Sequence, residues 1–271
     1  MENNIKELRL SVSKTKTYLD CKAKYNFSYN LHLPKREWGH LTFGKFCHKV
    51  LEDYHQIYLD GSKLPFNIVM AQAFKNAKEE FKKETNKEMI KECWEIINQY
   101  LKIVSKEKKP ANVIACEKKF NVVVGPSKLI ESGEVFNVSL IGMIDRVQID
   151  DDNVLRVIDY KTSKSKKYLA KDFFQLATYA WIMLLEDPSI KKVRGSYVLL
   201  RHNFEYITTE FKRDEILKIQ DKYLDYASRI INEQMYDPNP TPLCNWCDFQ
   251  ENCIIGKQKM APEKIYGEVT W

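Results

Sequence analysis

Gly142-Met-Ile-Asp145 and Val157-Ile-Asp159-Tyr-Lys161 lie in two apolar segments joined by the acidic stretch Asp150-Asp-Asp-Asn153. The segments, 138–149 and 154–161, are rich in Val, Ile and Leu, and the residues between them are typical of turns, so we predict a hairpin. Because strand side chains alternate between two faces, Asp159 and Lys161 point the same way and Tyr160 points the opposite way. Pairing of the two strands then brings Asp145 beside Asp159.

The two aspartates and Lys161 form a pattern that suits a divalent metal ion. Mg²⁺ or Mn²⁺ prefers carboxylate oxygens and activates water, while a lysine orients that water or neutralises a phosphate. A carboxylate near a lysine is more often a surface ion pair. Charges in central strands, however, are costly unless they are ligands or are paired. Both strands are apolar on both faces, through Leu140, Ile141, Met143, Ile144, Val157 and Ile158.

Periodicity along the chain predicts helices first, then strands, then helices again. Apolar residues recur at helical spacing over 13–30, 42–58, 65–83, 87–105, 171–186 and 213–235. Strand patterns cover 113–124, the hairpin, 192–201 and 204–211. This order predicts an α/β fold with a mixed sheet and a helical crossover.

One histidine, His48, lies on the predicted helix 42–58 and shares a face with Gly44 and Glu52. A lone helical histidine is more often a structural or surface residue than a metal ligand. The carboxylate hairpin strengthens a ligand role, and a glycine one turn before His48 allows a strand to approach closely. We therefore place His48 with Asp145 and Asp159 as a candidate metal ligand.

Gln175 and Tyr179 lie four residues apart on the predicted helix 171–186, so they face the same side. A helical tyrosine is more commonly an amphipathic core residue. The position of this helix just after the aspartate strand favours contact with phosphate or DNA. The linking loop is rich in lysines, which fit either a phosphate backbone or a solvated loop: Lys161, Lys164, Lys166, Lys167 and Lys171.

Seven cysteines do not indicate a disulfide framework, because the count is odd and the first residues have no secretory character. Three of them, Cys244, Cys247 and Cys253, crowd into ten residues after a proline-rich break. Cys21 can complete a four-thiolate site for either tetrahedral Zn²⁺ or a [4Fe-4S] cluster, and spacing does not choose between them. Cys47, Cys93 and Cys116 belong to no recognisable cysteine motif, so we expect them to be buried packing residues.

The hairpin residues resemble the PD-(D/E)XK nuclease superfamily, through Gly-x-x-Asp at 142–145 and Asp-x-Lys at 159–161. Ile158-Asp-Tyr-Lys-Thr162 resembles its RecB-like branch in particular. Gly44-Lys-Phe-Cys-His48-Lys-Val-Leu51 resembles the family helix whose histidine binds metal, and Phe174-Gln-Leu-Ala-Thr-Tyr179 resembles the helix that approaches substrate phosphate. Glu117, on the first predicted strand, resembles an acidic residue found on that strand in members of the family.

The cysteine set resembles the iron-sulfur clamp of CRISPR-associated adaptation nucleases and AddB-type nuclease domains. This resemblance favours a [4Fe-4S] cluster on Cys21, Cys244, Cys247 and Cys253. The implied fold is a restriction-endonuclease-like core, a mixed central sheet flanked by helices, with a helical insertion and a clamp joining the N- and C-terminal segments. We expect a single domain over 1–271, with cluster-binding segments 11–30 and 236–256, a helical region 42–106 and a nuclease core 111–211.

Length and charge fit this interpretation. A chain of 271 residues can bury a sizeable core, and a net charge of +6 permits a polyanionic partner without requiring one. The apolar run 179–185 is too short to cross a bilayer, so we expect no membrane association and a reducing cytoplasm.

The resulting hypothesis is a metal-dependent deoxyribonuclease, and the resemblance favours an exonuclease on single-stranded or end-containing DNA. One alternative is a nucleic-acid-binding or scaffolding subunit with an idle nuclease site, and another is a zinc-stabilised interaction protein. Protein partners in repair, replication or CRISPR adaptation are compatible with the resemblance.

Overall fold

The β3–β4 hairpin is present in the computed structural model, which describes residues 6–36, 39–166 and 172–257. Strand β3 (Val135–Ile149) and strand β4 (Leu155–Lys161) pair antiparallel, with Arg146 opposite Ile158. Asn153 in the connecting turn has a φ of 60°, a left-handed conformation that asparagine tolerates better than most residues. The predicted hairpin, its turn and the adjacency of Asp145 to Asp159 are therefore confirmed.

The chain divides into two compact units, each built from segments distant in sequence. Unit 1 contains Met1–Glu37, Val123–Leu140 and Tyr223–Trp271. Unit 2 contains Trp38–Val122 and Ile141–Lys222. Strand β2 (Val113–Lys128) pairs with β3, and both strands continue from one unit into the other.

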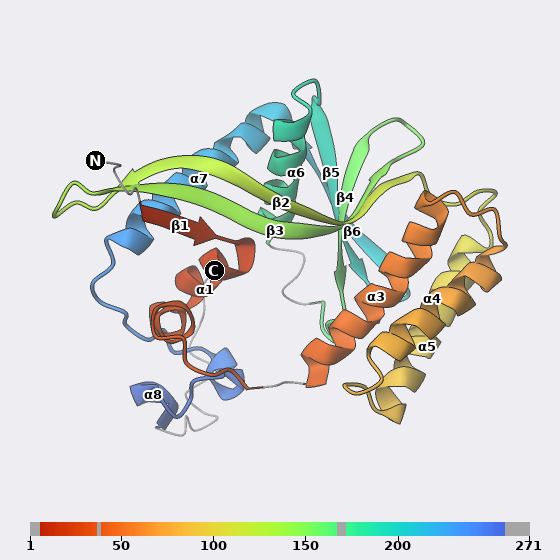
Figure 1. Cartoon of the computed structure of the whole chain (residues 1–271), viewed down its shortest axis with the longest axis horizontal. Helices are drawn as coiled ribbons and strands as arrows, with labels where there is room; N and C mark the ends of the chain where they lie inside the picture. The colour runs from red at the N-terminus through yellow and green to blue at the C-terminus, as the bar shows by residue number, and fades with distance from the viewer. Residues whose placement is uncertain (1–5, 37–38, 167–171, 258–271) are drawn as a thin grey trace. The chain divides into compact units, whose positions relative to one another are not determined.

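The sheet of unit 2 is mixed, as the sequence predicts. Strand β4 pairs in parallel with β5 (Lys192–Leu199), and β5 pairs antiparallel with β6 (Glu205–Lys212). Helix α6 (Phe174–Glu186) makes the crossover between the two parallel strands (Figure 1). It packs closely because β5 carries Gly195, where an added Cβ would lie 2.7 Å from the Leu176 side chain.

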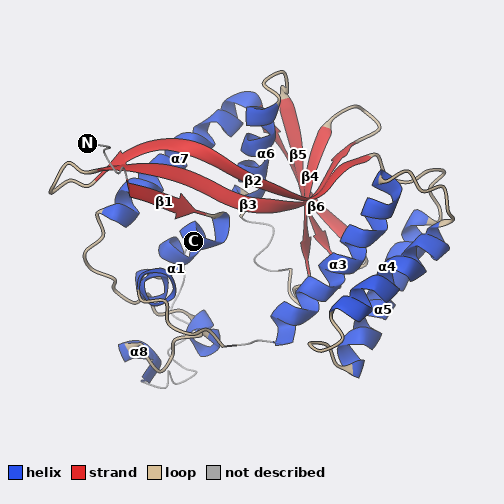
Figure 2. Ribbon diagram, in the orientation of Figure 1, coloured by secondary structure: helices blue, strands red, loops and turns tan. Residues whose placement is uncertain are grey.

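Three helices of unit 2 pack against the opposite face of this sheet and lie side by side (Figure 2). They are α3 (Gly39–Leu59), α4 (Phe66–Glu80) and α5 (Lys87–Val104). Their apolar residues form one core with Ile158 and Tyr160 of β4. Because β4 side chains alternate, Asp159 and Lys161 face α6 instead. The sheet thus separates a helical core from the charged groups of β4.

Not every apolar residue of β3 is covered. Leu140 and Ile144 are fully buried, whereas Ile141 and Met143 are each 39% exposed. The expectation that both faces of β3 are buried is therefore wrong at these two positions, while β4 is buried from Val157 to Tyr160. No helix in the described ranges has the length and apolar character needed to cross a bilayer.

Unit 1 differs from the predicted helix 13–30. Helix α1 (Val12–Asp20) ends at Cys21, whose extended backbone (φ −163°, ψ 111°) separates it from α2 (Lys22–Tyr25) and the π-helical turn η1 (Asn26–Asn30). Hydrogen bonds of Cys21 satisfy polar groups at both helix ends. Its backbone N–H donates to the Thr17 carbonyl at the end of α1, and its sulfur accepts the backbone N–H of Lys24 in α2. Periodicity alone does not reveal such a one-residue interruption.

The remaining described elements of unit 1 come from distant parts of the chain. The short strand β1 (Lys6–Leu10), which the pattern did not predict, pairs in parallel with β3, with Leu10 opposite Leu140. Helix α7 (Arg213–Ile231) continues from unit 2 into unit 1 and is followed by the 3-10 turn η3 (Pro242–Trp246) and α8 (Ile254–Lys257).

Candidate active site and cysteine pocket

Asp159, Lys161 and Gln175 form a closed set of polar contacts between β4 and α6. The Lys161 ammonium lies 2.6 Å from Asp159 Oδ2 and donates to Gln175 Oε1 at 2.9 Å. The Gln175 amide donates to Asp159 Oδ1 at 2.6 Å. Since Asp159 is only 4% exposed, these two side chains hold its carboxylate in one orientation.

Asp145 is held from two directions. Its Oδ2 atom accepts the backbone N–H of Tyr160 at 2.7 Å and lies 3.5 Å from Nδ1 of His48. The amide belongs to β4, the hairpin strand paired with β3, whereas the histidine comes from α3, so tertiary packing brings the histidine to the hairpin. The imidazole remains about one-third exposed, which leaves room for a further ligand beside it.

Glu117 brings a third ligand to this point. Its backbone has a φ of 45°, an uncommon left-handed conformation inside strand β2. A residue of this kind in a strand redirects its side chain, and such outliers concentrate at functional sites. The ligand atoms of His48, Glu117 and Asp145 lie within 4.8 Å of one another.

The electrostatics of these carboxyl groups favour a cation. Burial raises the pKa of Glu117 to about 8, with Asp145 and Glu52 adding to the effect. Burial, followed by the nearby Asp159, raises the pKa of Asp145 to about 6, although His48 and the Tyr160 amide oppose this rise. Neighbouring buried carboxylates repel one another when too little positive charge lies nearby. A divalent ion bound between them removes this repulsion.

The residues present therefore fit a hard divalent ion. Among the described residues, the set within metal-binding reach is His48, Glu117 and Asp145, which supplies one imidazole nitrogen and carboxylate oxygens. Asp159 lies next to this set across the hairpin, with its oxygens directed at Lys161 and Gln175. The arrangement offers a metal site beside an ammonium group, which is the combination that phosphate hydrolysis uses.

Gly44 and Gly142 explain how the elements come this close. An added Cβ at Gly44 would lie 3.2 Å from the Thr162 hydroxyl at the end of β4, so the predicted close approach of a strand to α3 is confirmed. At Gly142 a Cβ would overlap the ring of Phe120, so glycine lets β2 pack tightly against β3.

The residues expected to contact phosphate have mixed environments. Tyr179 is 5% exposed, accepts a hydrogen bond from the Gln175 amide at 2.8 Å and packs edge-on against Phe120. Gln175 itself is half-buried. In the loop after β4, Lys164 is exposed and Lys166 pairs with Glu205. Lys167 and Lys171 lie outside the described residues.

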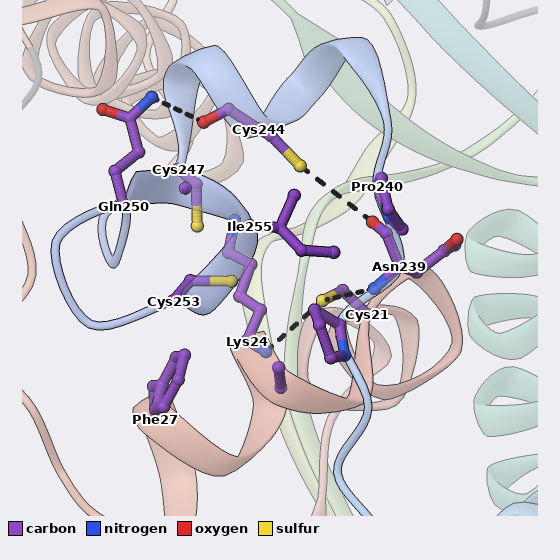
Figure 3. Close-up of a pocket in the computed structure, with 13 residues that line it drawn as sticks. Cys21, Lys24, Phe27, Asn239, Pro240, Cys244, Cys247, Gln250, Cys253 and Ile255 are labelled. Carbon is purple, nitrogen blue, oxygen red and sulfur yellow. Dashed lines mark hydrogen bonds between the residues drawn. The ribbon is translucent and has the colours of Figure 1, made fainter. Parts of the chain in front are cut away.

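Cys21, Cys244, Cys247 and Cys253 line one pocket of unit 1 (Figure 3). The sulfur of Cys21 accepts the backbone amides of Lys24 and Asn239, both at 3.5 Å, and that of Cys244 accepts the amide of Thr241 at 3.4 Å. Amide donors of this kind stabilise thiolates that bind metals. The fit is therefore to a thiolate-ligated cofactor.

A tetrahedral Zn²⁺ and a [4Fe-4S] cluster both take four thiolate ligands, so these four cysteines suit either cofactor. Cys47 and Cys93 are instead fully buried and contact each other, and Cys116 is half-buried.

Sequence patterns missed two features of the active site. Glu117 was noted only because it resembles an acidic position in the family. A strand pattern does not predict a left-handed residue, so it cannot show where this carboxylate points. Tyr160 was placed on the opposite face, which is where its side chain lies, but its backbone N–H contacts Asp145. The available signal was that Glu117 is the one acidic residue of the strand segment 113–124.

A family model of the PD-(D/E)XK nuclease superfamily matches residues 9–254. Two curated relatives are each named as a subunit of an ATP-dependent helicase/deoxyribonuclease. The protein of Clostridium botulinum is 28% identical over 273 residues, covering 86% of this chain and 23% of the relative. That of Clostridium perfringens is 25% identical over 195 residues, covering 64% of this chain and 17% of the relative. The chain thus spans less than a quarter of the length of either relative.

A solved structure of an exonuclease candidate from Eubacterium rectale shares the fold. It is 14% identical, and the match covers 96% of this chain and 94% of that chain with a TM-score of 0.50. At this identity the likeness concerns the fold alone. The predicted α/β architecture, a mixed central sheet flanked by helices, agrees with this match and with the family model.

Proposed function

We propose a function from one premise: the chain belongs to the PD-(D/E)XK nuclease superfamily. On this premise the protein is a metal-dependent deoxyribonuclease that hydrolyses phosphodiester bonds, acting as an exonuclease on single-stranded or end-containing DNA. The observation that carries the proposal is the convergence of His48, Glu117 and Asp145 beside the Asp159–Lys161 pair. That geometry supports a hydrolytic site rather than an ordinary surface ion pair.

Mg²⁺ or Mn²⁺ would be held by His48, Asp145 and Asp159, with Glu117 as a fourth contributor from β2. The ion would supply Lewis-acid stabilisation of charge that develops on the phosphate. Asp145 already has a fixed orientation, because the Tyr160 amide binds one of its oxygens. Preorganised ligands of this kind lose little freedom when the site is used.

Lys161 would act on the water or the phosphate, while Gln175 sets where the ammonium lies. The lysine is about one-quarter exposed and lies 5.0 Å from the centre of the Tyr197 ring, so it can reach a substrate at the surface of the site. Gln175 contacts both Lys161 and Asp159, which supports an orienting role. Gln175 and Tyr179 remain our candidates for contact with substrate phosphate.

The substrate proposal draws support from the family and from the names of the relatives, which include a deoxyribonuclease subunit and an exonuclease candidate. The test is digestion of end-labelled linear and covalently closed circular single-stranded DNA with Mn²⁺. We expect the linear substrate to be degraded and the circle to persist. Equal loss of both would indicate an endonuclease, and no loss of either would favour an idle site.

A histidine substitution tests the metal ligands. His48→Ala is expected to weaken Mn²⁺ binding by at least about tenfold and to lower cleavage strongly, because it removes an imidazole adjacent to Asp145. Stability should change little, since the side chain is partly exposed. Calorimetric titration checks this, with His40→Ala as control because His40 is exposed on the same helix. Unchanged affinity in His48→Ala would remove His48 from the ligand set.

We propose further that Cys21, Cys244, Cys247 and Cys253 hold a structural [4Fe-4S] cluster. Support comes from their common pocket and from the amide donors to Cys21 and Cys244, and the preference for iron-sulfur over zinc comes from the family resemblance. The cluster would join the N-terminal segment of unit 1 to its C-terminal segment. Its role would be structural because metal binding by thiolates is coupled to folding.

A second candidate function is that of a subunit in a larger assembly. The curated relatives are named as subunits and are more than four times as long as the matched region. Their names join the deoxyribonuclease to an ATP-dependent helicase, so a helicase-type partner or domain would suit this chain. Cleavage by the isolated chain would separate the active nuclease from an idle subunit.

A further inference from the structure

Tyr160 lies between Asp159 and Lys161 in sequence, but its ring is on the other side of the sheet and 4% exposed. One side of the ring meets the His48 imidazole, with centroids 5.7 Å apart and planes at 72°. The guanidinium carbon of Arg146 lies 5.6 Å from the ring centre. The ring thus contacts a candidate ligand and a buried cation at once.

Arg146 is itself rigidly held. It is 2% exposed, and its guanidinium contacts His55 Nε2 at 2.5 Å, the Tyr100 hydroxyl at 3.2 Å and the Tyr206 hydroxyl at 3.1 Å. None of these hydrogen-bonding groups is a carboxylate. Burial, followed by the Arg146 charge, lowers the pKa of His55, so the imidazole is neutral and its nitrogen can accept.

A guanidinium without an anionic partner is costly to bury, and replacing it with an apolar residue is often better for stability alone. The presence of a buried arginine at this position therefore calls for a reason other than stability. Its location suggests such a reason, because Arg146 directly follows Asp145 and its guanidinium adjoins the ring of Tyr160. Arg146 thus contacts the ring of the residue whose backbone N–H binds Asp145.

Tyr160 links both candidate ligands. Its backbone N–H binds Asp145 Oδ2 at 2.7 Å, while its ring meets His48. We propose that Tyr160 is a positioning residue, held by Arg146, that maintains the spacing of His48 and Asp145 for metal binding. This inference rests on the proposed metal-dependent function and adds two residues that neither bind the ion nor touch the substrate.

The hydroxyl of Tyr160 does not contribute to the proposed positioning of the metal ligands. In the described structure this oxygen is buried and has no hydrogen-bond partner. A buried hydroxyl without a partner destabilises a protein, so its removal should be harmless or favourable. Any effect of the Tyr160 side chain on the site should therefore come from the ring, which makes phenylalanine a conservative substitute and methionine a disruptive one.

The experiment compares Tyr160→Phe with Tyr160→Met by calorimetric titration of the full chain with Mn²⁺ in the absence of DNA. Residues that orient metal ligands typically change affinity by about 10–100-fold. We expect Tyr160→Met to lose at least about tenfold and Tyr160→Phe to remain within about twofold of the unsubstituted protein. Tyr160→Phe should also melt at the same temperature or higher.

A packing control separates positioning from loss of stability. Val198 pairs with Tyr160 in the sheet, is 1% exposed and belongs to the same core. Val198→Ala should lower the melting temperature while keeping Mn²⁺ affinity. Equal affinity in Tyr160→Met and the unsubstituted protein would overturn the positioning role, as would an equal loss in Tyr160→Phe.

Two further outcomes are informative. If Tyr160→Met does not fold, Arg146→Lys replaces it, since lysine keeps the charge but cannot reproduce the planar contacts of the guanidinium. Its Mn²⁺ affinity should fall, and unchanged affinity would overturn the role of Arg146. If the unsubstituted protein binds no Mn²⁺, the proposed metal-dependent function fails together with this inference; failure in the variants alone affects only the inference.

Discussion

Lys161→Ala is expected to abolish DNA cleavage while leaving the fold and most DNA binding intact. The ammonium is needed mainly as the phosphate becomes more negative, so its removal affects the transition state more than binding. Loss of one such charge typically lowers turnover by about 10²–10³-fold. The lysine also contacts Asp159 and Gln175, so some loss of order in that carboxylate should accompany the change.

Asp159→Ala should behave differently, because it removes a carboxylate at the metal site. We expect cleavage to be lost and Mn²⁺ affinity to fall, whereas Lys161→Ala should keep most of its Mn²⁺ affinity. Turnover on labelled DNA at saturating Mn²⁺, together with calorimetry, separates the two roles. Lys91→Ala serves as the control, since this lysine is exposed on α5 and is not among the proposed site residues. Turnover at the level of the unsubstituted protein in either Lys161→Ala or Asp159→Ala would refute the proposed site.

The second large effect is expected at the cysteine pocket. Replacing Cys21, Cys244, Cys247 or Cys253 singly by serine should reduce bound iron and sulfide and destabilise the protein. Structural thiolate sites contribute about 10 kcal/mol or more in small metal-dependent peptides. Losing even half of such a contribution would lower the melting temperature of a chain of this size by roughly 10–20 °C.

The three other cysteines provide the control. Cys116→Ser changes a half-buried thiol outside the pocket, and Cys47→Ala and Cys93→Ala remove fully buried thiols from the helical core. These variants should retain iron, with losses of about 1–3 kcal/mol typical of core substitutions. A colourless protein that carries one zinc would overturn the iron-sulfur proposal but keep the four ligands. Full cluster occupancy in Cys21→Ser would overturn the four-cysteine site.

Features that depend on local periodicity and turn chemistry were predictable from the amino-acid sequence. The apolar segments around Asp145 and Asp159 with an acidic turn between them specify the hairpin, because strand alternation and turn preferences act over a few residues. The same alternation correctly separates Tyr160 from Asp159 and Lys161. Gly44 likewise indicated a close strand, since a missing Cβ is visible in the sequence itself.

The meeting of side chains that are distant in sequence depends on how the chain packs in three dimensions. The left-handed backbone of Glu117 turns its carboxylate toward His48 and Asp145, and the extended backbone of Cys21 interrupts a helix that periodicity predicts as continuous. The linkage of Tyr160 to Arg146 and His48 spans three elements. Such conformations are locally unfavourable and persist because packing from elsewhere in the chain compensates them, so no local pattern encodes them.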